Sequence, residues 1–391
     1  MITFEEAYKK MMAHSVPWSV ETVSLDMALG RVLADDVLSD MDMPPFNKSA
    51  MDGYACRRED LEHPLTVVEH IPAGVFPTKA IGSRQCSKIM TGAPVPEGAD
   101  CVAMVEWTEP VTEQTIRFTG QDTADHICLK GEDIQAGDCV LKAGERLGPA
   151  HVAVLASVGC VTPEVYRQAR VGVIATGSEL VEPVSKPQPA EIRNSNSYQL
   201  CAQIDQMGAI PQYYGIVEDQ ADAIHRLIAK AKAENDVILL SGGVSMGDFD
   251  LVPDILKENG FELLFESVAM KPGRPTVFGR SDNRFCFGLP GNPVSTYVVF
   301  ELMVKPFLYQ LMGHAFCAPI VTVTLDQAVK RRKTIRQSTL PVVFTGPRTV
   351  SPIDYHGSAH IGAMSKAQGL ITLPVGTQEI AKGSHVHVRP L

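Results

Sequence analysis

The sequence lacks an apolar run long enough to span a membrane. The longest apolar stretch of its C-terminal half, residues 297–312, is interrupted by Glu301, Lys305 and Pro306, whereas a membrane-spanning helix needs about 20 consecutive apolar residues. The first residues also lack the basic and apolar segments of a secretory signal, and Thr3 and Glu6 instead have the spacing of a helix capping box. We therefore expect a cytoplasmic protein with no membrane partner.

Paired cysteines and an excess of positive charge are also missing. The nine cysteines form no C-x-x-C pair and no Cys/His cluster at zinc spacing, which is typical of reduced cytosolic thiols and argues against a structural zinc site. The net charge of −10 argues against broad binding to nucleic acid, which favours a basic face. An anionic ligand must therefore meet a local basic cluster.

The common nucleotide-binding motifs are absent as well. No G-x-G-x-x-G follows an expected strand, and residues 242–247 resemble a phosphate-binding P-loop only until Asp248 stands where that motif has lysine. The known nucleotide-binding fingerprints therefore fail here, which argues against a P-loop ATPase.

The length and the 45% hydrophobic content predict a chain that divides into several domains. Between residues 168 and 310, buried-type strands at 171–175 and 237–240 alternate with a helical pattern at 223–233, which predicts an α/β domain with a mostly parallel sheet. Short strand patterns at 65–68, 103–107 and 138–141 predict a β-rich insertion.

Helical patterns are expected at 25–33 and from Pro149 to a capping glycine at 159. After Pro306 we expect the helical signal to end and strands to follow at 320–325, 340–344, 370–373 and 385–389. The predicted organisation is multidomain α/β plus β, with these parts: an extended domain from 1–49 and 146–167, a β-rich inserted domain at 50–145, an α/β domain at 168–310, and a C-terminal β domain at 311–391.

Three loops of similar design leave buried strands of the α/β domain, at 176–179, 241–245 and 288–293. Ligands of open α/β sheets bind outside the carboxyl ends of the strands, and glycines and hydroxyls beside helix N-termini suit a phosphate and a polar ring. Each loop taken alone is equally well a tight strand-to-helix turn. The candidate ligand-binding residues are Thr176, Gly177, Ser178, Ser241, Gly242, Gly243, Ser245, Pro290, Gly291 and Asn292.

Charged residues accompany these loops. Lys271 and Arg274 flank a proline-glycine turn and suit a dianion such as molybdate or phosphate, although a solvated basic turn is the plain alternative. Glu179, Asp248 and Asp250 supply carboxylates, which beside phosphates hold magnesium or orient water. Asp248 is equally well a helix N-cap.

With these motifs in order, the sequence resembles the molybdopterin molybdenumtransferases, the MoeA and gephyrin E-domain family, through nearly its whole length. The matching stretches are residues 44–46 with 49–55, 90–100, 131–134, 176–180, 241–250, 271–275 and 288–293. Seven motifs in one order make a chance similarity very improbable.

The resemblance implies an elongated homodimer of four-domain chains, with each active site between the α/β domain of one subunit and the N-terminal segments of the other. It also implies the reaction: adenylylated molybdopterin and molybdate give molybdenum cofactor and AMP, with Mg²⁺ as the divalent cation. A molybdopterin adenylyltransferase is then the expected supplier of the substrate.

The resemblance further implies functional roles for Asp52, Thr91, Glu179, Asp250 and Lys271, with Asp219 as a weaker match. Lys271 and Arg274 are assigned to molybdate or phosphate. Glu179, Asp219 and Asp250 are assigned to the cation, and Glu179 and Asp250 alternatively to the attacking water. Asp52 and Thr91 are expected to come from the partner subunit.

Three positions depart from the family pattern. Arg274 stands where lysine is common, residues 126–130 hold one basic residue where relatives often have several arginines, and Ala363 stands where serine is common. The departures at residues 126–130 and Ala363 favour the alternative hypothesis of a paralogue that binds molybdopterin or finished cofactor as a carrier or scaffold, whereas arginine at 274 is expected to alter the affinity for the oxyanion. Insertion of tungstate is a third hypothesis, because tungstate has the charge and nearly the size of molybdate.

Overall fold

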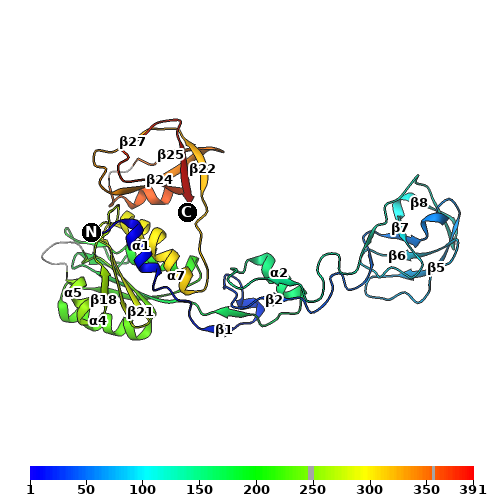
Figure 1. Ribbon diagram of the computed structural model, residues 1–391, viewed down its shortest axis with the longest axis horizontal. Helices are drawn as coiled ribbons and strands as arrows, with labels where there is room; N and C mark the ends of the chain where they lie inside the picture. The colour runs from blue at the N-terminus through cyan, green and yellow to red at the C-terminus, as the bar shows by residue number, and fades with distance from the viewer. Residues whose placement is uncertain (245–250, 355–356) are drawn as a thin grey trace. The chain divides into compact units, whose positions relative to one another are not determined.

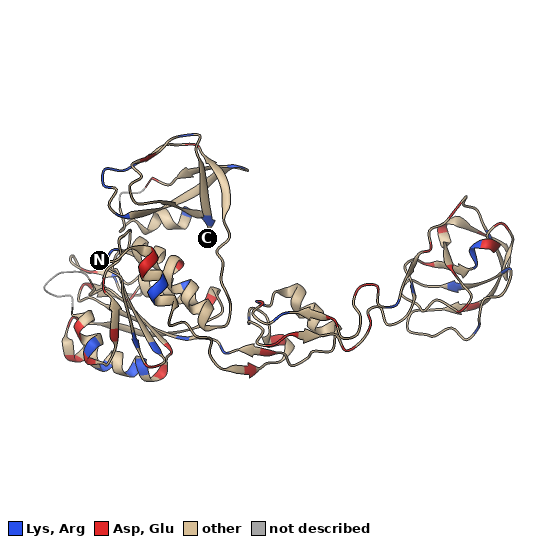
Figure 2. Ribbon diagram, viewed as in Figure 1, with Lys and Arg blue, Asp and Glu red and all other residues tan. Residues whose placement is uncertain are grey.

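The computed structural model describes residues 1–244, 251–354 and 357–391, which form two compact units. Unit 1 comprises Met1–Ala34, Gly144–Gly148 and Glu164–Leu391, and unit 2 comprises Asp35–Ala143 and Pro149–Pro163 (Figure 1). Acidic and basic residues are scattered over both units (Figure 2). Within the described residues, no helix is long and apolar enough to cross a membrane. The finer division into four domains stays a prediction.

The α/β part of unit 1 is built on a six-stranded sheet in the order β16-β13-β17-β21-β20-β18. The first three pairings are parallel and the last two are antiparallel, so the prediction of a mostly parallel sheet is confirmed. The strands are β16 (Ile210–Val217), β13 (Arg170–Thr176), β17 (Val237–Ser241), β21 (Arg284–Leu289), β20 (Val277–Ser281) and β18 (Glu262–Phe265).

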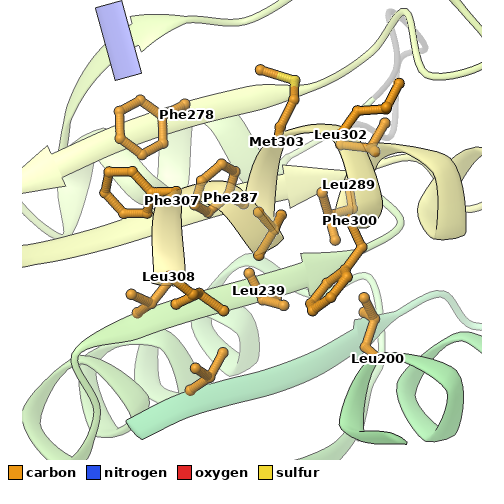
Figure 3. Close-up of a cluster of buried hydrophobic side chains, with 14 of the residues drawn as sticks. Leu200, Leu239, Phe278, Phe287, Leu289, Phe300, Leu302, Met303, Phe307 and Leu308 are labelled. Carbon is orange, nitrogen blue, oxygen red and sulfur yellow. The ribbon is translucent and has the colours of Figure 1, made fainter. Parts of the chain in front are cut away.

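Helices cover both faces of this sheet because successive strand residues point to opposite sides. Leu239 packs with Phe278, Phe287 and Phe307 on one face (Figure 3), while Leu240 packs with the helices of the other face. The helices are α1 (Phe4–Met12), α3 (Asn196–Gln206), α6 (Pro293–Val299) and α7 (Lys305–Leu311) on the first face, and α4 (Ala221–Glu234) and α5 (Val252–Glu258) on the second.

The expected end of the helical signal at Pro306 is wrong. A π-helical turn, Phe300–Val304, follows α6, and α7 continues through Pro306 to Leu311. Pro306 lies in the first turn of α7, where its missing N–H is tolerated, and the Glu301 carbonyl accepts a hydrogen bond from the guanidinium of Arg389 instead.

The C-terminal part of unit 1 is a β domain, as predicted. Its strands are ordered β19-β24-β25-β22-β28-β26, and an added β24–β26 pairing closes the sheet on itself. A curled sheet of this kind encloses its core, which includes Leu325 and Ile371. The elements are β19 (Met270–Lys271), β22 (Val321–Leu325), β24 (Gln337–Gly346), β25 (Thr349–Pro352), β26 (Gly369–Leu373), β28 (His385–Pro390), the β23 (Val329–Lys330) and β27 (Glu379–Ile380) pair, and a 3-10 segment, Ile361–Lys366.

The N-terminal residues of unit 1 confirm one prediction and correct another. Thr3 and Glu6 form the capping box of α1, with bonds of 3.1 and 2.9 Å. The expected helix at 25–33 is only a 3-10 turn, Leu25–Met27, since a short isolated helix is marginal and Gly30 adopts a φ of +78°.

Two short strand pairs complete unit 1. Strand β1 (Val20–Thr22) pairs with β12 (Glu164–Tyr166), and β14 (Leu180–Val181) pairs with β15 (Ile192–Arg193).

Unit 2 contains a six-stranded sheet in the order β7-β4-β6-β5-β9-β8, so the expected β-rich insertion is present. Its strands are β4 (Gly53–Cys56), β5 (Leu65–Ile71), β6 (Gln85–Ile89), β7 (Cys101–Met104), β8 (Thr108–Thr112) and β9 (Thr115–Phe118). The strand expected at 138–141 lies outside this sheet. It is β11 (Cys139–Leu141), which pairs with β2 (Val37–Leu38), while β3 (Lys48–Ser49) pairs with β10 (Ile127–Cys128) and α2 spans Pro149–Ser157.

Candidate functional site

Four parallel strands of unit 1 end at the same edge of the sheet, at Thr176, Val217, Ser241 and Leu289. The loops that follow them line a cleft of about 700 Å³, a size that suits a small-molecule ligand. The predicted loop residues on its wall are Thr176, Gly177, Glu179, Ser241, Gly242, Gly243, Pro290, Gly291 and Asn292. The expectation that three loops converge at the strand ends is thus confirmed geometrically.

The glycines of the second loop lie directly on the first. Gly242 has a φ of +102°, and a Cβ there would lie 2.4 Å from the carbonyl oxygen of Thr176. A Cβ on Gly243 would lie 2.9 Å from Thr176 Oγ1. At Gly291 the nearest atom to such a Cβ is Gly242 Cα, at 3.8 Å. Glycine at 242 is therefore required by the close approach of two backbones, whereas a Cβ at 243 would meet side chains, with Val252 Cγ2 nearest at 2.8 Å.

Thr176 ends β13 beneath this loop and is 2% exposed. Its Oγ1 atom has no hydrogen-bond partner among the described residues. A buried hydroxyl without a partner costs free energy, so its position at the floor of the cleft marks a polar site rather than a packing site.

Two carboxylates reach the cleft from neighbouring strands. Asp219, just after β16, accepts a hydrogen bond from the Ser178 backbone N (3.2 Å), and Ser178 Oγ accepts one from the Asp219 N (3.4 Å). The exposed Glu179 carboxylate lies over Gly177, where a Cβ would be 2.6 Å from Oε2. The weaker sequence match at Asp219 is therefore placed on the same wall as Glu179.

These carboxylates bear on metal binding. Within the described part of the chain, no group of three or more His, Cys, Asp or Glu side chains forms a self-sufficient metal site. Glu179 and Asp219 nevertheless fit the mode in which Mg²⁺ is held by one or two carboxylates, substrate phosphates and water. Asp250 of the predicted metal set lies outside the described residues, as do Ser245 and Asp248.

Sequence reasoning missed the wall formed by residues 192–196. Asn196, the first residue of α3, donates from Nδ2 to Ser241 Oγ (2.8 Å) and to the Gly291 carbonyl (2.7 Å). Asn194 donates to Tyr213 Oη (2.7 Å). The signal was the Asn-Ser-Asn-Ser run before a helical pattern, which is also typical of an ordinary helix start.

The C-terminal domain also contributes to the cleft. Val294 at the start of α6 donates its backbone N–H to the Ser358 carbonyl (3.0 Å), and Ala359 and Ile361 line the wall. These residues lie far along the sequence from the glycine loops and carry no motif, so the sequence alone did not indicate them. Ala363, in the next turn, is 8% exposed.

Lys271 and Arg274 lie beside the cleft without lining it. Both side chains are exposed, and Pro275 of the same turn is part of the wall. The turn packs closely on α6, since a Cβ on Gly273 would lie 2.5 Å from Val299 Cγ2. Lys271 is the register partner of Ser338 in the β19–β24 pairing. The two cations thus project from a fixed turn between the α/β and C-terminal domains.

Asp52 and Thr91 belong to unit 2 and form a pair there. The Thr91 backbone N and Oγ1 both donate to Asp52 Oδ1, at 2.6 and 2.8 Å. These two bonds, the backbone bond first, lower the pKa of the Asp52 carboxyl below its ordinary value. Asp52 and Thr91, both predicted from the sequence to be functional residues, are thus in direct contact.

A larger cleft, of about 1150 Å³, lies at the opposite edge of the sheet. There Arg167 binds Asp236 through two hydrogen bonds (2.7 and 3.1 Å), and Arg284 binds the same carboxylate at 2.6 Å. Arg167, Arg284 and Asp236 of this cleft thus bind one another. The cleft lies at the amino ends of β13, β17 and β21. Since ligands of such sheets bind at the carboxyl ends, we assign the candidate site to the smaller cleft.

Comparison with known proteins covers the whole chain. Family models described as the MoeA N-terminal region (domain I and II), a probable molybdopterin binding domain and the MoeA C-terminal region (domain IV) match residues 2–159, 172–310 and 323–391. Proteins named molybdopterin molybdenumtransferase from Staphylococcus epidermidis and Bacillus subtilis are 38% and 35% identical. The alignments cover 99% of this chain in both cases, and 95% and 93% of the relatives.

Solved structures agree with this assignment. A molybdopterin biosynthesis MoeA protein from Pyrococcus horikoshii OT3 superposes with a TM-score of 0.85 at 28% identity, covering 100% of both chains. A second crystal structure of the Pyrococcus horikoshii MoeA protein gives a TM-score of 0.82 at 30% identity, covering 100% of this chain and 99% of the other. The chain therefore belongs to the MoeA family of molybdopterin molybdenumtransferases.

Proposed function

We propose that this protein inserts molybdate into adenylylated molybdopterin, releasing AMP and forming molybdenum cofactor. The observation that carries the proposal is the convergence of three glycine loops, two buried hydroxyls and two carboxylates at the carboxyl ends of the four parallel strands. This edge is where α/β sheets bind phosphorylated ligands. The full-length similarity to proteins named molybdopterin molybdenumtransferase supports the same chemistry.

The glycine loops are the proposed phosphate and pterin contacts. Gly242, Gly243 and Gly291 carry no side chain above the cleft, so backbone N–H groups can approach a phosphate closely. The Ser241 hydroxyl adds a polar group on the same wall. The backbone and hydroxyl groups would hold the phosphoanhydride without relying on a large positive charge, in a chain whose net charge is −10.

Glu179 and Asp219, together with Asp250, are the proposed ligands of Mg²⁺. When bound, the ion would offset charge on the phosphoanhydride as the AMP leaving group departs. The Ser178 backbone N–H fixes the carboxylate of Asp219, which orients it before a ligand arrives. Glu179 is exposed, and its alternative role is to orient the attacking water.

Lys271 and Arg274 are the proposed binding groups for the molybdate dianion. They project from the fixed turn beside Pro275, and cations held in fixed directions lose less entropy on binding an oxyanion. The planar guanidinium of Arg274 replaces an ammonium group common in the family, and the two bind oxyanions with different geometry.

The proposal includes a homodimer in the cytoplasm, with Asp52 and Thr91 supplied to each cleft by the partner subunit. A molybdopterin adenylyltransferase would supply the substrate. The direct contact of Asp52 with Thr91 supports their action as one group. Analytical ultracentrifugation tests the dimer, and mixing an Asp52→Ala chain with a Lys271→Ala chain tests the shared site, because mixed dimers would regain one intact cleft.

The test of the reaction is incubation of the purified protein with adenylylated molybdopterin, Mg²⁺ and molybdate, following AMP and active cofactor together. Molybdate-dependent release of AMP with cofactor formation is expected, and tungstate in place of molybdate tests the choice of oxyanion. Tight binding without turnover would instead support the carrier hypothesis, which the departures at residues 126–130 and Ala363 favour.

The variant Lys271→Ala tests whether this residue acts in the site rather than in the stability of the fold. The side chain is exposed, so we expect loss of insertion with unchanged thermal unfolding. Lys9→Ala, which removes another exposed lysine of unit 1 from α1, is the matched control and should keep full activity. Unfolding of the Lys271→Ala protein would refute the assignment of this residue to the site.

A further inference from the structure

We propose that Asn196 is a positioning residue that fixes two of the ligand loops and sets the Ser241 hydroxyl as a hydrogen-bond donor to the substrate phosphate. This inference rests on the proposed function for its ligand and on the structure for its geometry. Asn196 lies at the start of α3, in a segment that no motif of the sequence singled out.

The side-chain amide of Asn196 bridges two separate loops. Its Nδ2 atom donates to Ser241 Oγ at 2.8 Å and to the Gly291 carbonyl at 2.7 Å. Ser241 and Gly291 follow different strands, and Asn196 precedes them by 45 and 95 residues. With Asn196 only 9% exposed, these buried bonds connect the second and third loops across the cleft wall.

The orientation of the amide follows from its partners. The Gly291 carbonyl can only accept a hydrogen bond, so the atom facing it must be the amide nitrogen. Both Nδ2 protons are then in use, while Oδ1 has no partner among the described residues. The two bonds of Nδ2 therefore determine how this side chain lies.

The same geometry sets the direction of the Ser241 hydroxyl. Because Ser241 Oγ accepts a hydrogen bond from Asn196 Nδ2, its own O–H remains to donate, and it donates to no acceptor among the residues described. Ser241 is 3% exposed and lines the cleft. Phosphate oxygens only accept hydrogen bonds, so a hydroxyl held with its O–H directed into the cleft can donate to them.

Asn196 is itself held in place. Asn194 donates from Nδ2 to Ser197 Oγ (3.1 Å) and Tyr213 Oη (2.7 Å), and its Oδ1 accepts from the Ser197 backbone N (3.2 Å). Tyr213 lies on β16. The start of α3 is therefore tied to the sheet, so Asn196 meets the two loops from a rigid base rather than from a free chain.

The two hydrogen bonds from Asn196 to Ser241 and Gly291 form what we call the clamp. Hydrogen–deuterium exchange tests, without any ligand, whether the clamp holds the two loops in place. In Asn196→Ala we expect faster exchange in peptides that contain residues 241–244 and 288–293, because each loop loses a buried bond. Tyr198→Phe is the matched control, since it removes an exposed hydrogen bond to Glu182 from the same helix and should leave both loops unchanged. Unchanged exchange in Asn196→Ala would overturn the clamp.

Calorimetric titration with AMP measures the role of the clamp in ligand binding. A hydrogen bond to a charged group is worth about 1.5–3 kcal/mol, so Asn196→Ala should weaken AMP binding roughly ten-fold or more. Ser241→Ala should weaken it similarly. The double variant should be little worse than either single variant, because Asn196 acts through Ser241. Additive losses would show that Asn196 does not act through this hydroxyl.

The outcomes separate this inference from the proposed function. If the native protein binds AMP and Asn196→Ala binds it equally well, the positioning role fails and the proposed function stands. If the native protein does not bind AMP at all, the proposed function fails and the phosphate role of Ser241 fails with it. In either case, the hydrogen–deuterium exchange measurement shows whether Asn196 holds the two loops.

Discussion

Thr91 donates two hydrogen bonds to one oxygen of Asp52, from its backbone N at 2.6 Å and from Oγ1 at 2.8 Å. The backbone bond belongs to the loop and survives any change of side chain, whereas the hydroxyl bond belongs to threonine alone. Both favour the charged carboxylate and lower its pKa. The pair therefore offers a way to separate the two contributions.

Thr91→Val is expected to raise the pKa of Asp52 partway towards its ordinary value, because only the hydroxyl bond is lost. The folded-state pKa of native Asp52 is depressed, so its contribution to stability is present above the unfolded pKa and is lost as pH falls through the folded pKa. Carboxyl ¹³C titration checks the shift, and unfolding at neutral and acid pH checks the linkage. Thr66→Val, an exposed threonine of β5, should leave Asp52 unchanged, and an equal shift there would contradict the assignment.

Gly242→Ala and Gly291→Ala form a matched pair in the ligand loops. Alanine at 242 must adopt a φ of +102° with its Cβ 2.4 Å from the Thr176 carbonyl, so we expect a loss of about 2 kcal/mol or more in the free energy of unfolding. Alanine at 291 meets its nearest atom at 3.8 Å and should cost less than about 1 kcal/mol. Urea unfolding of both variants measures the difference. Equal costs would show that the second loop does not rest on Thr176 in solution.

The sequence was sufficient to predict the glycine loops because strand ends and turn residues are local signals. Short apolar runs such as 237–240, bounded by polar and glycine residues, are typical of buried strands, and parallel strands bring their carboxyl ends to one edge. Asn196 was missed because its function depends on Ser241 and Gly291, which are distant in sequence. A local pattern gives only a helix start at that position.

Pro306 illustrates the opposite limit. Proline predicts the end of a helix because it lacks an N–H, yet here the helix continues through a π-helical turn. The Glu301 carbonyl in that turn is satisfied by Arg389, which lies at the other end of the C-terminal domain in sequence. A long-range contact thus overrides a local rule.

The nine cysteines should differ sharply in reactivity. Burial raises the pKa of the Cys86 thiol to about 12 and that of Cys201 to about 11, and the thiolate is the reactive form. Cys139 and Cys317 are exposed. A brief pulse of iodoacetamide near neutral pH should therefore label Cys317 and Cys139 first, as read by mass spectrometry of peptides.

Unfolding in urea before the pulse is the control for this experiment, and all nine cysteines should then react. In the folded protein, Cys56 and Cys101 should stay unlabelled because both are fully buried in the unit 2 core. Rapid labelling of this pair would mean that the sheet of unit 2 opens readily, contrary to its close packing.

Glu301 tests the buried network that connects the α/β helices to the C-terminal domain. Its carboxylate, 3% exposed, binds Lys305 at 2.8 Å and accepts from Gln203 Nε2 at 2.9 Å. Glu301→Ala removes one charge and leaves Lys305 partly buried without its partner, so we expect a loss of about 3–5 kcal/mol. The double change Glu301→Leu with Lys305→Met removes both charges and fills the space, and it should cost far less.

Urea unfolding of the single and double variants measures this difference. Arg389 also donates to the backbone carbonyl of residue 301, and this bond survives in every variant. Its guanidinium lies 3.9 Å from the Glu301 carboxylate as well, and the single and double variants both lose that contact, so their difference isolates the cost of leaving Lys305 unpaired. If the double variant is as unstable as Glu301→Ala, then the cost arises from the contacts of the carboxylate with Gln203 and Arg389, which both variants lose, rather than from an unpaired Lys305.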